Sequence, residues 1–278
     1  MTAAEVRAAL RAGTISGPTE RLAPDHVQAN LVVVPHAYAG DLRDLCARNP
    51  VPCPLVEELA PGGFEPCCAP GADLRTDLGC YRVWRDGALA ERPRDVRALW
   101  SDELVAFLIG CSFTFDHALA EAGLPPRHYA QARNVPMYRT RVPLAAAGRL
   151  SGTMVVSMRP YKADEIERVR AATRPYRVAH GEPVAWGDPA ALGIADLARP
   201  EYGDPPLLEP GDVPVFWGCG VTPQSVIVAS RLPFAITHEP GHMFVTDLVH
   251  AQLAAPDASA TERPPLMGRR LGADGLTG

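Results

Sequence analysis

The segment from Val213 to Leu248 reads VPVFWGCGVTPQSVIVASRLPFAITHEPGHMFVTDL. Its succession of expected strands and an expected helix decides the fold class. Short apolar runs bounded by turn residues predict three strands, at Val213–Trp217, Phe234–His238 and Met243–Leu248. Between the first two, Thr222 can cap a helix that begins with Pro223, so Ser225–Ser230 is expected to be a helix or a further strand. This alternation predicts an α/β protein.

Expected strands and helices also follow one another through the rest of the chain. Further strands are expected at Ala29–Val34, Cys80–Trp84, Val135–Val142 and Thr153–Met158, and helices at Ala39–Arg48, Asp102–Ile109, Thr114–Gly123 and Asp164–Thr173. The strands and helix within residues 131–208 predict a small inserted α+β module, closed by the proline-rich segment Pro200–Pro210. The main α/β domain is then discontinuous, at residues 1–130 and 209–254. The small, polar tail, residues 255–278, is expected to be disordered.

Composition and charge exclude several classes of partner. A formal net charge of -5 provides no basic surface for nucleic acid. The sequence has no apolar run of about 18 residues, so no membrane partner is expected. Seven cysteines, an odd number, and no apolar signal segment favour the cytoplasm over a secreted disulfide framework. Lys162 lies in a charged segment and is the single lysine, which disfavours pyridoxal chemistry. The oligomeric state stays open, with a homo-oligomer as one alternative.

The letters His238-Glu239-Pro240-Gly241-His242 match the H-E-x-x-H pattern of zinc metalloproteases. That pattern needs a helix, because only a helix puts both histidines on one face beside the metal. Proline in a helix interior costs about 3 kcal/mol, and Pro-Gly is typical of the centre of a β-turn. We therefore expect a turn between two strands and no protease site.

Two histidines on such a turn, His238 and His242, can still act together. They can serve as general acid and base without a metal, and no cofactor is expected. A non-protease metal site completed by Cys219 or Asp247 is an alternative, although the spacing has no standard metal signature. The remaining alternative is a pair of histidines that only form hydrogen bonds near a strand end.

A glycine-rich turn follows the strand that ends at Trp217. Gly218 and Gly220 flank Cys219, and glycine lets the backbone approach a ligand closely. Thr222 follows as a helix cap, and Gln224 lies in the first turn, where free N–H groups would favour a carboxylate. The alternative is a tight turn with a buried, inert thiol.

Two further segments have groups suited to an anion. Cys111 and Ser112 lie just before an expected helix, where the helix dipole lowers the pKa of a thiol, although such a kink is also a common packing device. Arg139 and Arg141 follow Asn134 and would share one face of a strand, where they could bind a carboxylate bidentately. The alternative is a solvated strand edge.

With these residues assembled, the sequence resembles the D-glutamate cyclase family, short bacterial proteins also known as hydro-lyases. The resemblance runs from about Pro24 to Leu248. It rests on ordered motifs at His26–Asn30, Asn49–Pro54, Gly110–Phe113, Arg133–Tyr138, Val156–Pro160, His180–Pro183, Gly187–Pro189, Phe216–Gln224, Ile236–His238 and Pro240–Met243.

The resemblance implies a three-layer α/β/α sandwich with a mixed sheet, plus a smaller inserted two-layer α+β module. It also implies removal of water from a small amino or carboxylic acid, which for D-glutamate gives 5-oxo-D-proline. The partner would be a small-molecule carboxylate or amino acid. Such a reaction needs a base for the ammonium, donors for the oxyanion and an acid for the leaving hydroxide.

The candidate residues can be assigned to these tasks. We expect His238 and His242 to act as acid and base, and backbone N–H groups from Gly218 to Thr222, with Gln224, to hold the oxyanion. Arg139 or Arg141 would bind the α-carboxylate, and Cys219 could act as a nucleophile through an acyl intermediate. Asn134, Cys111 and Ser112 complete the expected substrate-binding set. The alternatives are a non-catalytic carboxylate-binding protein and a metal-dependent hydratase or hydrolase.

Overall fold

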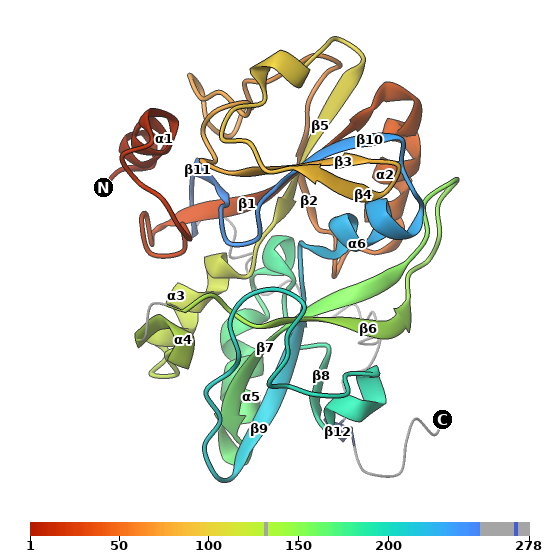
Figure 1. Cartoon of the computed structure of the whole chain (residues 1–278). Helices are drawn as coiled ribbons and strands as arrows, with labels where there is room; N and C mark the ends of the chain where they lie inside the picture. The colour runs from red at the N-terminus through yellow and green to blue at the C-terminus, as the bar shows by residue number, and fades with distance from the viewer. Residues whose placement is uncertain (131–132, 251–269, 272–278) are drawn as a thin grey trace.

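The computed structural model describes residues 1–130 and 133–250 and the backbone of residues 270–271 (Figure 1). The α-helices are α1 (Ala3–Ala12), α2 (His36–Arg48), α3 (Phe113–Glu121), α4 (Arg127–Ala130), α5 (Ile166–Thr173) and α6 (Thr222–Ala229). The strands are β1 (His26–Pro35), β2 (Leu55–Glu58), β3 (Tyr81–Arg85), β4 (Ala88–Glu91), β5 (Leu104–Gly110), β6 (Met137–Pro143), β7 (Thr153–Lys162), β8 (Ala185–Gly187), β9 (Asp212–Gly218), β10 (Phe234–His238), β11 (Phe244–Val249) and β12 (Arg270–Leu271).

The first sheet has the order β2-β5-β1-β10-β3-β4, with β11 also paired to β1, and its described pairs are antiparallel. Strand β1 changes partner along one of its edges. Val32 lies opposite Thr237 of β10, whereas Ala29 lies opposite Phe244 of β11. The turn between β10 and β11 therefore leaves the sheet at this change of partner, near Asn30.

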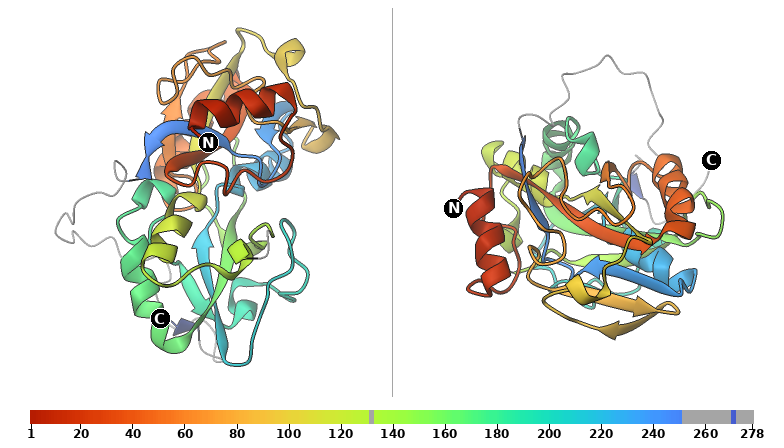
Figure 2. Two further views of the ribbon diagram at one scale, coloured as in Figure 1. Left: turned by 90° about the vertical axis from the view of Figure 1, so that its left-hand side faces the viewer. Right: turned by 90° about the horizontal axis from the view of Figure 1, so that it is seen from above.

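Both faces of the first sheet are buried. Alternate residues of β1 and β5 pack against α2 and α6 on one face, where Leu42, Leu45 and Val226 join the core. On the other face the sheet packs against the segment that joins β2 to β3, through residues such as Leu74 and Leu78. Helix α1 packs beside β11 through Val6 and Leu10 (Figure 2).

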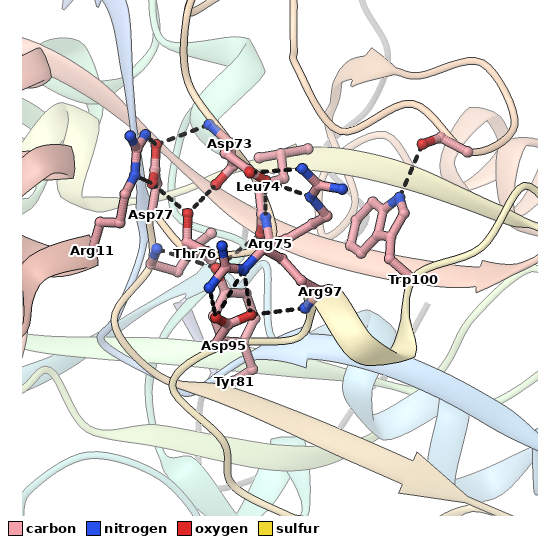
Figure 3. A network of polar contacts seen from close by, with 12 residues as sticks. Arg11, Asp73, Leu74, Arg75, Thr76, Asp77, Tyr81, Asp95, Arg97 and Trp100 are labelled. Atoms are coloured by element: carbon pink, nitrogen blue, oxygen red, sulfur yellow. Dashed lines mark hydrogen bonds and ion pairs between the residues drawn. The ribbon is translucent and has the colours of Figure 1, made fainter.

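Polar contacts hold the segment that covers this second face (Figure 3). The buried Asp77 carboxylate accepts hydrogen bonds from the Arg11 guanidinium through both oxygens, each at 2.7 Å. The Tyr81 hydroxyl donates to the Leu74 carbonyl at 2.9 Å, and the Trp100 indole N–H donates to the Gly62 carbonyl at 3.0 Å. A segment with little regular structure is thus fixed against the sheet, because its buried polar groups have partners.

The second sheet has the order β12-β8-β9-β7-β6, and it is mixed because β12 pairs in parallel with β8. Helices α3 and α5 cover one face, where Phe115 and Val169 pack with Trp217. Figure 1 shows the two sheets one above the other, with α3 and α6 at the level where they meet.

The predicted helix at Asp102–Ile109 is wrong, because Leu104–Gly110 is strand β5. All seven residues of β5 are buried, since β1 and β2 flank it and both sheet faces are covered. A strand buried on both faces has a continuous apolar run, which periodicity cannot separate from a buried helix. The open choice at Ser225–Ser230 is settled as helix α6.

The α/β fold class is confirmed, whereas the three-layer arrangement stays a prediction. The division into a discontinuous main domain and an inserted module also stays a prediction. Strand β9 belongs to the second sheet, because it pairs with β7 and β8, and the chain returns to the first sheet only after Gly218. Among the described residues, no helix is long and apolar enough to span a membrane. Apart from the backbone of β12, the tail predicted at residues 255–278 lies outside the described residues.

Candidate active site at the junction of the two sheets

Four of the predicted motifs meet in one buried cluster between the two sheets. Cys111, Met137, Cys219 and Met243 each come from a different motif and pack in this cluster. The other members are Phe113, Val135, Val155, Tyr202 and Val221. We call this set the junction cluster. The chain thus brings the ends of β5 and β9 and the starts of β6 and β11 to one place.

Glycines allow the backbones to approach closely here. A Cβ atom added to Gly220 would lie 1.9 Å from Asn30 Nδ2 and 2.8 Å from the Gly110 carbonyl oxygen. The Asn30 amide donates to that same oxygen at 2.7 Å, so it joins β1 to the end of β5. A Cβ atom on Gly218 would lie 3.1 Å from the Val51 carbonyl oxygen. The predicted close backbone approach is therefore made to other parts of the chain.

The two thiols of the junction cluster are buried. Burial raises the pKa of Cys219 to about 11, although a hydrogen bond from the Val221 N–H opposes this. Burial likewise raises the pKa of Cys111 well above its usual value, against a hydrogen bond from the Phe113 N–H. The expectation that the helix start would lower the pKa of Cys111 is wrong, because the loss of hydration outweighs the helix dipole.

His238 ends strand β10 and is fully buried. Its Nδ1 lies 3.3 Å from the Leu31 carbonyl oxygen, and its Nε2 has no hydrogen-bond partner among the described residues. Burial lowers the pKa of His238 to about 4, so the imidazole is neutral at neutral pH. Gln224 is also buried, and its amide donates to the His238 carbonyl oxygen at 3.0 Å.

The predicted turn between β10 and β11 is confirmed. The His242 N–H donates to the Glu239 carbonyl oxygen at 2.8 Å, and Gly241 has a φ of +94°. The Glu239 carboxylate is held by the Arg82 guanidinium through both oxygens and also by Arg92. His242 is half-buried, and burial lowers its pKa against the opposing charge of Glu239. His242 is thus the more accessible of the two predicted histidines.

The prediction that Thr222 caps the helix is wrong, because Thr222 is the first residue of α6 and Val221 precedes it as the N-cap. The Thr222 side chain is buried and bridges two elements instead. Its hydroxyl accepts a hydrogen bond from the Val155 N–H at 3.1 Å and lies 2.7 Å from the Cys219 carbonyl oxygen. Thr222 therefore fixes the start of α6 against β7, and its hydroxyl is occupied by the chain.

The predicted arginines share one exposed face of β6, on either side of the buried Thr140. Arg139 donates to the Tyr202 hydroxyl at 3.0 Å, which places it at the edge of the junction cluster. Arg141 instead packs against Gly193, where an added Cβ would lie 2.4 Å from its Cγ. The structure thus brings only Arg139 to the junction.

Asn134 links β6 to the turn that carries His242. Its backbone N–H donates to Asp204 at 2.7 Å, and its Nδ2 lies 3.5 Å from the Pro240 carbonyl oxygen. Its side-chain oxygen is buried without a hydrogen-bond partner among the described residues.

The sequence reasoning missed a buried ion pair at the centre of this region. Arg159 and Asp116 are fully buried, and the guanidinium donates to both carboxylate oxygens at 2.6 and 2.7 Å. The same guanidinium donates to Ser112 at 3.0 Å, so that predicted substrate-binding hydroxyl is already occupied. Arg159 lies in a motif recognised from the sequence, but its apolar neighbours in β7 gave no sign of a charge partner.

One group of three potential metal ligands occurs among residues 1–130 and 133–250. The ligand atoms of Glu20, Asp116 and His128 lie within 4.8 Å of one another. Asp116 is already neutralised by Arg159, and His128 Nε2 lies 2.7 Å from the Glu20 carboxylate. Burial raises the pKa of Glu20 to about 7 and lowers that of His128 to about 4. These donors fit a shared proton better than a metal, because a metal needs deprotonated ligands that are free to bind it.

Comparison with known proteins agrees with the motifs in this region. The family model described as D-glutamate cyclase matches residues 105–247. Relatives named "Putative hydro-lyase" include one from Bordetella pertussis, 55% identical over 252 residues, covering 90% of this chain and 91% of the relative. One from Rhodococcus jostii is 52% identical over 257 residues, covering 92% and 98% of the two chains. One from Stutzerimonas stutzeri is 50% identical over 254 residues, covering 91% and 96%.

Proposed function

Because this chain belongs to the D-glutamate cyclase family, we propose that it is a hydro-lyase that removes water from a small amino or carboxylic acid. D-Glutamate, which would close to 5-oxo-D-proline, is the substrate to test first. The observation that supports this proposal most is the junction cluster, where Cys111, Cys219 and Met243 bring three motifs of the family together. Family membership supports the reaction class, and the cluster supports this location for the site.

In this proposal His242 is the proton acceptor. Its lowered pKa keeps the imidazole neutral at neutral pH, and a neutral imidazole can take a proton from the substrate ammonium. Its half-buried position leaves it reachable from solvent. His238 is fully buried behind the same turn, so we assign it a positioning role, shared with Gln224, which binds its carbonyl oxygen.

The oxyanion that forms on the attacked carboxyl group needs donors that are already oriented. The Gly220 N–H precedes α6 and donates no hydrogen bond to another described residue. We assign the oxyanion to this N–H, because the helix N-terminus adds a favourable dipole. Arg139, at the edge of the cluster, would balance the charge of a substrate carboxylate.

The role of Cys219 as a nucleophile has less physical support. A thiol whose pKa is raised to about 11 is protonated at neutral pH, and the thiolate is the reactive form. The scheme therefore runs by direct attack of the amine on the γ-carboxyl group. The ammonium loses two protons, and His242 passes them to one carboxyl oxygen, which leaves as water with no acyl intermediate. The alternative is that the protein binds a small carboxylate without chemistry.

The experiment that separates these two proposals is a turnover assay with the purified full chain. NMR spectra of D-glutamate incubated with the protein would show the signals of 5-oxoproline if the acid is cyclised. We expect His242→Gln to lower the rate by at least about 100-fold, in the range of a lost general base. The control is His36→Gln, at an exposed position at the start of α2. Tight D-glutamate binding without product from the unmodified protein would instead favour the binding role.

A further inference from the structure

A small cavity opens beside the junction cluster, next to α4 and the start of β6. Its enclosed volume is about 10 Å³, and the space inside it together with its open mouth is about 270 Å³. The polar part of its lining comes from Arg127, His128, Arg133 and Asn134, and the rest is apolar, with Met158 and several prolines. The enclosed part is about the size of one water molecule, so a bound group would lie largely in the open mouth, between stiff proline walls.

The two arginines of the cavity differ in their partners. Arg127 is neutralised, because its guanidinium binds both carboxylate oxygens of Asp212. Arg133 forms no ion pair with any residue of 1–130 or 133–250, although it is half-buried. A half-buried guanidinium without a counterion favours an anion, and its planar donors match a carboxylate.

Asn134 supplies the second polar group. Its side-chain oxygen is buried and lacks a donor among the described residues, which is uncommon for a buried polar atom. Its amide nitrogen already faces the Pro240 carbonyl oxygen. The vacant oxygen suits the ammonium of an amino acid or the hydroxyl of a hydroxy acid.

His128 lies at the same cavity, and its ring contacts the buried carboxyl group of Glu20. Its Nε2 lies 2.7 Å from the Glu20 carboxylate, which leaves Nδ1 as the ring nitrogen free for a bound molecule. Because the Glu20–His128 pair can share one proton, Nδ1 can donate to an anion when Nε2 accepts that proton.

We propose that this cavity binds the amino-acid or hydroxy-acid end of a small substrate, with its carboxylate on Arg133 and its ammonium or hydroxyl on the Asn134 oxygen. His128 donates a further hydrogen bond to the carboxylate, and Glu20 is a positioning residue for that ring. The inference rests on the proposed function for the identity of the acid. Asn134 also contacts the turn that carries His242, through its amide nitrogen.

Calorimetric titration of the full chain with D-glutamate and with glutarate, which lacks the ammonium, tests the proposal. Arg133→Gln should weaken the binding of both acids by about 10- to 100-fold, as expected for a lost charged hydrogen-bond pair. Asn134→Leu should weaken D-glutamate and leave glutarate nearly unchanged. The control is Arg85→Gln, whose guanidinium lies over the Phe234 ring on the first sheet, outside the cavity.

Equal affinities of the unmodified protein and Arg133→Gln would overturn the proposal. So would the absence of binding of either acid at concentrations up to about 10 mM. Because Arg133 makes no ion pair among the described residues, its substitution should leave the unfolding midpoint unchanged, which checks that the variant is folded. Arg133-dependent binding without turnover would remove the proposed hydro-lyase activity and keep the site. Turnover that is unaffected by Arg133→Gln would remove the proposed binding site and keep the proposed hydro-lyase activity.

Discussion

Replacement of Gly220 by alanine tests the geometry of the junction most sharply. The added Cβ would lie 1.9 Å from Asn30 Nδ2, 2.4 Å from Asn30 Cγ and 2.8 Å from the Gly110 carbonyl oxygen. The carbonyl belongs to backbone at the end of β5, so it cannot rotate away as a flexible side chain could. Asn30 must move, and it is buried.

The cost can be estimated from the contacts that would be lost. Asn30 donates to the carbonyl oxygens of Ile109 at 3.2 Å and Gly110 at 2.7 Å. Loss of these bonds costs about 1 kcal/mol each, and overpacking a core typically costs about 1–3 kcal/mol. Gly220→Ala should therefore destabilise the protein by about 3–5 kcal/mol, a large part of the stability of an ordinary domain.

Urea unfolding followed by circular dichroism measures this cost. With a slope of about 3 kcal/mol per molar urea, the midpoint should fall by about 1–1.7 M. The matched control is Gly40→Ala in α2, where an added Cβ meets no atom within 4 Å. Alanine should stabilise that helix by about 0.5–1 kcal/mol. If Gly220→Ala were as stable as Gly40→Ala, the close approach described here would be wrong.

Three further predictions concern buried groups. Arg159→Met should lower the free energy of unfolding by about 3–5 kcal/mol, because it leaves the Asp116 charge unpaired. In urea unfolding, the double variant Arg159→Met with Asp116→Leu should regain most of that stability. Burial lowers the pKa of His180 to about 4, so the stability it contributes is complete above about pH 6.5 and is lost as the pH falls toward 4. The difference in unfolding free energy between pH 7 and pH 5 should therefore shrink by about 2 kcal/mol in His180→Gln, and an unchanged difference would contradict this. Iodoacetamide should modify the exposed Cys67 well before Cys219 in the folded protein, as mass spectrometry of peptides would show; equal rates would mean that Cys219 is accessible.

Much of the fold could be predicted from local patterns. Pro240 and Gly241 marked the turn between β10 and β11 because proline and glycine restrict the backbone in known ways, and the structure confirms that turn. The helix predicted at Asp102–Ile109 failed because β5 is buried on both faces and has no alternation to read. Local patterns therefore work where one face is exposed or a turn is short.

The candidate site could be predicted only in part. Motifs indicated Cys111, Cys219 and Met243, and the structure brings them into one cluster. The pairing of Arg159 with Asp116 and the contact between His128 and Glu20 could not be predicted, because each joins residues far apart in the chain. Whether an arginine has a carboxylate partner also depends on the fold. Arg127 binds Asp212, whereas Arg133, at the same cavity, forms no ion pair with a described residue.

The central claim is that this chain removes water from a small acid at the junction of the two sheets. The most direct test is a screen of D- and L-amino acids and hydroxy acids with the purified chain, read by mass spectrometry for a product lighter by one water. We predict that D-glutamate or a close analogue is converted, and that His242→Gln slows the conversion by at least about 100-fold while His36→Gln does not. Binding of these acids without loss of water from any of them would contradict the claim.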